Sequence, residues 1–76
     1  MSKRLANKNV RSRVIRALKR AGFQADEDGP HTVMFDPDNP QRYTTIPRHA
    51  RIKPTLLRAI IKQCGLTVQR FLDLYR

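Results

Sequence analysis

Two histidines are the side chains best suited to acid–base chemistry in this sequence, because an imidazole titrates near neutral pH. His31 stands in the stretch EDGPHTVMF, and His49 stands in the basic stretch IPRHARIKP. Beside bound RNA, an imidazole can take the proton of a 2′-hydroxyl that attacks its own 3′ phosphate, while nearby cations stabilise the developing charge. Such a cleavage needs no metal. The structural alternative is a strand histidine, or a loop histidine, that only hydrogen-bonds its neighbours.

Other catalytic chemistries lack the necessary residues. The two histidines, Cys64 and the acidic residues do not cluster at the short spacings of metal sites. The stretch DPDN alternates like a calcium loop, but the glycine and the terminal glutamate of that loop are absent. With three glycines in the chain there is no glycine-rich phosphate loop. We therefore expect no metal, no cofactor and no small-molecule ligand.

The charge is large and unevenly distributed. Sixteen Lys and Arg residues against six Asp and Glu residues give a net charge of +10. Residues 1–22 carry eight cations and no acid, residues 23–41 carry five acids and no cation, and residues 42–76 carry eight cations and one acid, Asp73. Solvated helix faces can be basic, but an excess this large in a short chain favours a polyanion, and nucleic acid is the usual one.

The length of 76 residues predicts one domain, residues 1–76, in which residues 1–8 form a loosely ordered basic start. The content of 39% hydrophobic residues is typical of a folded protein. No apolar run is long enough for a membrane span, and the first residues lack the apolar core of a secretory signal. We expect a cytoplasmic protein that does not bind membranes, with Cys64 reduced and buried.

Hydrophobic spacing predicts three helices and three strands. Helical spacing extends from Asn9 to Ala21, with Asn7 or Asn9 as the cap and Gly22 as the stop residue. The runs FQA, HTVMF and RYTTI are separated by turn-forming residues and predict short antiparallel strands. A second helix starts at Pro54 and ends at Gly65, and a short third helix follows Thr67. The apolar stripe of the second helix is Leu56, Leu57, Ile60, Ile61 and Cys64.

The order of these elements predicts an α+β fold. A three-stranded antiparallel sheet closes a core when both main helices pack on one of its faces. The order α-β-β-β-α, with a short extra C-terminal helix, is the layout of a double-stranded-RNA-binding-like domain. The other face of the sheet would stay open to a ligand or partner.

Several stretches resemble one family. VIRALKRAGF, GPHTVMF with DP after it, and IPRHARIKPTLLRAIIKQCGLTVQRFLDL are similar, in order and composition, to the HicA toxins, small ribonucleases of bacterial toxin–antitoxin pairs. The resemblance implies a double-stranded-RNA-binding-like fold, metal-independent cleavage of mRNA through one histidine on the second strand, and neutralisation by a HicB antitoxin. The matching histidine is His31. The RNA-binding candidates are Lys19, Arg20, Arg48, His49, Arg51 and Lys53.

The catalytic stretch departs from the family pattern. Family members usually carry Gly-Ser-His or Gly-Gly-His and reach the aromatic residue of the strand three residues later, whereas Pro30 precedes His31 here and Phe35 lies four residues after it. Strand side chains alternate between faces. If Phe35 anchors the core, His31 turns inward and Thr32 takes the catalytic place, although threonine is no general base at neutral pH. A different turn at Pro30, or a bulge, would restore an outward His31.

Three functions follow from these observations. The first is a HicA-like mRNA endoribonuclease with His31 as its general acid and base. The second is a HicA-like RNA-binding protein without cleavage activity. The third is a small basic DNA-binding regulator, which the order of the elements disfavours, because only residues 54–75 could form a helix-turn-helix pair. An acidic antitoxin surface would compete with RNA for the same cations.

Overall fold

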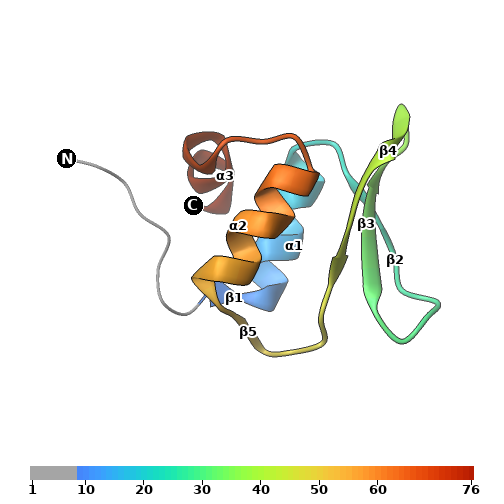
Figure 1. Cartoon of the computed structure of the whole chain (residues 1–76), viewed down its shortest axis with the longest axis horizontal. Helices are drawn as coiled ribbons and strands as arrows, with labels where there is room; N and C mark the ends of the chain where they lie inside the picture. The colour runs from blue at the N-terminus through green and yellow to red at the C-terminus, as the bar shows by residue number, and fades with distance from the viewer. Residues whose placement is uncertain (1–8) are drawn as a thin grey trace.

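The computed structural model describes residues 9–76, and the predicted loose start, residues 1–8, lies outside the described residues. Three helices lie on one side of a three-stranded sheet, and two short strands pair beside them (Figure 1). The elements in chain order are β1 (Asn9–Val10), α1 (Arg11–Arg20), β2 (Gln24–Asp26), β3 (Thr32–Asp36), β4 (Asn39–Ile46), β5 (Arg51–Ile52), α2 (Pro54–Gln63) and α3 (Val68–Tyr75).

The first helix starts two residues later than its periodicity suggests. Asn9 and Val10 form β1, which pairs antiparallel with β5, and the Asn9 amide donates to the Ile52 carbonyl oxygen at 3.3 Å. The expected cap at Asn9 is therefore wrong: Val10 precedes α1, and no side chain caps it. Two-residue strands carry no detectable alternation, so β1 and β5 leave no signal in the sequence.

The main sheet has the order β2-β3-β4, with both pairs antiparallel. Thr32 lies opposite Ile46, and Met34 lies opposite Thr44. The register shifts between Phe35 and Asp36, next to the turn that joins β3 to β4. β4 is the longest strand and forms one edge of this sheet.

Apart from the start of α1, local signals define the helix ends as expected. Gly22 and Gly65 follow α1 and α2 with φ angles of +100° and +70°, in the left-handed region that favours glycine. Pro54 occupies the first turn of α2. The Thr67 hydroxyl accepts a hydrogen bond from the Arg70 backbone N–H at 3.1 Å and caps α3.

The core lies between the helices and the inner face of the sheet. It includes Val14 and Leu18 of α1, Met34 and Ile46 of the sheet, and Phe71 of α3. The stripe of α2 is buried as expected except at Leu56, which is 40% exposed. Leu56 does not pack into this core because it lies on the side of α2 that faces a surface groove beside β4.

This arrangement confirms the α+β fold expected from the sequence. Two main helices and a three-stranded antiparallel sheet follow the α-β-β-β-α order of a double-stranded-RNA-binding-like domain, with α3 added at the C-terminal side. In the described part of the chain no helix has both the length and the apolar character to cross a membrane.

Candidate functional site

The alternation of β3 determines which side chains face outward. Thr32 and Met34 are fully buried against the helices, whereas His31 is exposed and Val33 and Phe35 are only partly buried. We call the surface that carries His31 and Val33 the open face. The alternative in which Phe35 anchors the core and Thr32 turns outward is therefore wrong. Met34 fills the core position, three residues after His31.

Thr32 has a structural environment. Its hydroxyl accepts a hydrogen bond from the Arg11 guanidinium and donates one to a Glu27 carboxylate oxygen at 3.2 Å. Arg11 also donates from Nε to the Pro47 carbonyl oxygen at 2.9 Å. This chain of contacts joins the start of α1 to the segments before and after the β3–β4 hairpin. A buried hydroxyl with both a donor and an acceptor partner is stable where it lies.

Arg48 holds the loop that carries His31. Its Nε donates to the Pro30 carbonyl oxygen at 2.8 Å, and its Nη2 lies 3.1 Å from the Gly29 carbonyl oxygen and 3.4 Å from that of Glu27. One planar guanidinium thus spans the loop between β2 and β3. Arg48 was expected to bind RNA phosphate, and the structure places its side chain on the backbone immediately before His31.

His31 borders a shallow hollow of about 270 Å³ on the open face. Val33 and Thr45, which lie opposite each other on β3 and β4, also line it. The hollow is completed by the loop residues Asp26, Asp28, Gly29 and Pro30. The Asp26 carboxylate accepts the Asp28 backbone N–H at 3.1 Å, which bends the loop around the hollow.

The second histidine lies in a segment attached to the same end of the sheet. The hydrogen bond from Arg48 to Pro30 joins the residue before His49 to the residue before His31. His49, Arg51 and Lys53 are all exposed, and they follow Arg48 through β5 to the start of α2. The backbone N–H of Arg11 donates to the Ala50 carbonyl oxygen at 3.0 Å, so this segment is fixed to α1.

Lys19 and Arg20 lie elsewhere. They occupy the last turn of α1, and at about 1.5 Å per residue this turn is ~13 Å along the helix from Arg11, which contacts Thr32. Arg20 donates from Nη1 to the backbone oxygens of Leu74 and Arg76 at 2.8 and 2.7 Å. These two candidates are therefore not brought together with His31.

Sequence reasoning missed the supporting contacts of Arg11 and Thr32. Both are ordinary residue types. The partners of Arg11 are Thr32 and Pro47, which lie 21 and 36 positions from it in the sequence. No spacing pattern could have revealed such distant pairs.

Among residues 9–76, no three His, Cys, Asp or Glu side chains gather closely enough to hold a metal ion. Cys64 is buried, as expected, and forms no disulfide within the described residues. Burial raises the pKa of its thiol to about 11, although the Arg42 guanidinium opposes this shift.

Comparison with known proteins identifies the family. The family model described as "HicA toxin of bacterial toxin-antitoxin" matches residues 11–66. This range extends from the first residue of α1 past the end of α2 and contains His31 and every other candidate site residue. A search of curated proteins found no match. Because the matched range covers well over half of the chain, this protein belongs to the HicA family of bacterial toxins.

Proposed function

We propose that this protein is a metal-independent endoribonuclease that cleaves mRNA, with His31 as its general acid and base. The observation that carries the proposal is the exposed position of His31 on the open face, in a loop held by Arg48. An exposed imidazole at the border of a hollow can approach a bound ribose, which a buried one cannot.

The proposed reaction is an intramolecular transesterification. His31 takes the proton of a ribose 2′-hydroxyl, and the 2′ oxygen forms a bond to the adjacent phosphorus. The bond from phosphorus to the 5′ oxygen of the next nucleotide breaks, and the imidazolium returns a proton to that oxygen. The products are a 2′,3′-cyclic phosphate and a 5′-hydroxyl. His31 removes one proton and returns one, so it ends the reaction in its starting state.

The proposed phosphate ligands are polar and basic side chains of the segment that Arg48 joins to the His31 loop. Arg51, Lys53 and His49 are exposed in the segment that Arg48 attaches to the His31 loop. The partners of Arg48 are neutral carbonyl oxygens, so these hydrogen bonds do not neutralise its positive charge. The positive charges of Arg48, Arg51 and Lys53 would stabilise the negative charge that develops on the phosphorane oxygens. Lys19 and Arg20 would contact a more distant part of the RNA.

The proposed protein partner is a HicB-like antitoxin in the cytoplasm, where mRNA is translated. A chain with a net charge of +10 would attract an acidic antitoxin surface, and that surface would compete with RNA for the same cations.

One observation favours a second candidate, an RNA-binding toxin without cleavage activity. Asp26 and Asp28 line the same hollow as His31. Their carboxylates would repel a phosphate group placed deep in this hollow. RNA would then bind the cations without presenting its ribose to His31.

Cleavage assays in EDTA distinguish these candidates. We would incubate fluorescent RNA at fixed salt with the wild-type chain, His31→Ala and His49→Ala. If the protein is an endoribonuclease that uses His31, His31→Ala should lower the cleavage rate by about 100-fold or more, while His49→Ala should mainly weaken RNA binding. An RNA with 2′-deoxyribose at every position should bind without cleavage.

Three results would contradict the proposal. Equal cleavage by wild type and His31→Ala would remove His31 from the reaction. Binding without cleavage by all three chains would support the second candidate. Displacement of RNA by duplex DNA at equal salt would favour the DNA-binding alternative.

A further inference from the structure

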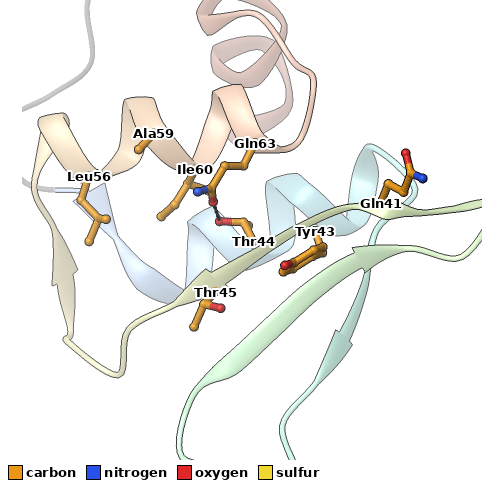
Figure 2. Close-up of a pocket in the computed structure, with 8 residues that line it drawn as sticks. All are labelled: Gln41, Tyr43, Thr44, Thr45, Leu56, Ala59, Ile60 and Gln63. Carbon is orange, nitrogen blue, oxygen red and sulfur yellow. Dashed lines mark hydrogen bonds between the residues drawn. The ribbon is translucent and has the colours of Figure 1, made fainter.

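A groove of about 420 Å³ lies between β4 and α2, outside the His31 hollow (Figure 2). Its α2 wall consists of Leu56, Ala59, Ile60 and Gln63, whose spacing of three and four places them on one helix face. Its β4 wall consists of Gln41, Tyr43, Thr44 and Thr45.

The β4 wall is the edge of the strand. Tyr43 and Thr45 point to the open face and Thr44 points to the helices, yet these three consecutive residues all line the groove. Side chains of opposite faces border one space only where that space runs along the strand's edge. β4 has no further strand beside it within residues 9–76, so this edge offers unpaired backbone N–H and C=O groups.

Two large apolar side chains lie exposed on the groove walls, among polar Gln and Thr side chains. Among the described residues the exposed large hydrophobic side chains are Tyr43, at 56%, and Leu56, at 40%, and they line opposite walls of this groove. Between the walls the Thr44 hydroxyl donates to the Gln63 side-chain oxygen at 2.5 Å (Figure 2). An unpaired strand edge beside apolar side chains is the surface to which an extended peptide adds as a further strand.

The charges around the groove indicate which kind of partner would bind there. The groove lining itself carries no charged side chain. The strand and helix that form its walls carry three cations outside the lining, Arg42, Arg58 and Lys62, and no acid. Near the hairpin tip Arg42 pairs with Asp36 at 3.5 Å, and Asp38 is exposed, so the acids lie at that end only. A second copy of this chain would bring the same cations against themselves, at a net charge of +10 for each molecule.

We infer that this groove binds an extended acidic segment of a protein partner, which adds to β4 as a fourth strand. Pro40 and the register shift beside Asp36 disrupt pairing at the tip of the hairpin, so the added strand would lie along residues 41–46. At about 3.4 Å per residue this length accommodates a segment of ~6 residues.

The added strand would also lie next to the His31 hollow. Thr45 lines both the groove and the hollow. Strands in a sheet are about 4.8 Å apart, so the new strand would lie ~10 Å from β3 and would extend the open face. Its side chains would then obstruct RNA at His31. This last step rests on the proposed function, in which the partner is the antitoxin, whereas the docking itself does not.

Peptide titrations followed by NMR test the docking without any cleavage assay. The probe is a blocked heptapeptide of sequence EVDIEVD, with two comparison peptides: the lysine version KVKIKVK, and EVDIEVD with alternate backbone amides N-methylated. We expect the acidic peptide to shift the amide resonances of residues 41–46 and to slow their hydrogen exchange. The lysine and N-methylated peptides should bind at least ten times more weakly.

Two variants of α2 locate the binding site. Leu56→Glu places an acid in the groove and should weaken binding of the acidic peptide by about tenfold. Thr55→Glu makes the same change of charge at an exposed α2 residue outside the groove lining, and it should change binding by less than about twofold.

Several outcomes would overturn the inference. These are equal binding of the N-methylated peptide, equal binding of the lysine peptide, equal effects of the two variants, or no shift in β4 at millimolar peptide. Protection of the groove by RNA in place of the peptide would assign it to nucleic acid. If the peptide binds but His31→Ala leaves cleavage unchanged, the docking stands and the proposed function fails.

Discussion

Arg48 illustrates how one side chain combines a charge with a structural task. Its guanidinium contacts three carbonyl oxygens of the loop that leads to His31. A lysine at the same place would supply the charge but not the planar set of donors. The arginine therefore fixes the backbone that leads to His31, and under the proposed function its charge would also act on a phosphate.

The positioning role predicts the behaviour of Arg48→Lys. We expect this variant to cleave RNA at least tenfold more slowly, because the His31 loop loses its tether while the net charge is unchanged. The matched control is Arg51→Lys, which keeps its charge at an exposed strand position and should retain most activity. The loop itself is followed by the NMR signals of the His31 imidazole, which should broaden or shift only in Arg48→Lys. Equal activity of the two variants, with unchanged His31 signals, would assign Arg48 a purely electrostatic role.

Single residues also show where sequence reasoning ends. The stop glycines, Pro54 and the Thr67 cap act through their own backbone or nearest neighbours, so residue type alone predicted them. The direction of His31 depends on whether Met34 or Phe35 fills the core, and that choice is made by packing against helices distant in sequence. Both residues are hydrophobic, and composition could not distinguish them.

At the scale of elements, the two helix ends at Gly22 and Gly65 differ in their surroundings. A Cβ at Gly22 would meet no atom within 4 Å, whereas one at Gly65 would lie 3.0 Å from the Arg42 Nε. The same Arg42 donates from Nε and Nη2 to the Cys64 carbonyl oxygen at 3.0 and 2.5 Å. The end of α2 is thus joined to β4 by a side chain that needs the space above Gly65.

Alanine should therefore destabilise the protein more at Gly65 than at Gly22. Gly22→Ala should lower the free energy of unfolding by about 1 kcal/mol, since only the left-handed backbone is strained. Gly65→Ala should lower it by roughly 2 kcal/mol, because Arg42 must also move. Gly29→Ala, in open space and without a positive φ, is the control and should stay within about 0.5 kcal/mol. Urea unfolding measures all three variants. Equal losses of unfolding free energy at Gly22 and Gly65 would show that Arg42 moves away from a Cβ at no energetic cost.

Longer elements were predicted better than short ones. The helices and the three main strands follow from periodicity over several residues, and the structure confirms them. β1 and β5 have two residues each, and their pairing joins Asn9 to Ile52 across most of the chain. This contact moved the start of α1 and fixed the segment of His49, which is why neither feature was visible in local patterns.

For the whole molecule, the buried Cys64 links stability to alkaline pH. Its folded-state pKa is raised from 9.0 to about 11, chiefly by burial. Below pH 9 the thiol is protonated in both states and contributes no pH dependence. Between pH 9 and 11 the unfolded chain loses this proton while the folded chain keeps it, so the stability falls as pH rises.

Comparison with Cys64→Ala isolates this effect. Urea unfolding at pH 8, 9, 10 and 11 should show that the wild type loses up to about 1.4 kcal/mol per pH unit more than the variant above pH 9. The variant should be less stable at pH 8, because it leaves a small cavity. Parallel pH profiles would mean that the thiol ionises equally in the folded and unfolded chains.

The arginines that donate to backbone carbonyls have a consequence for the entropy of binding. Arg11 and Arg48 are already held by backbone carbonyl oxygens, so their side chains have few rotamers left to lose. A flexible cation gives up about 0.5–1.5 kcal/mol of conformational freedom when it grips a ligand. Part of that loss is here incurred during folding, so these two arginines would lose less conformational entropy when a polyanion binds them.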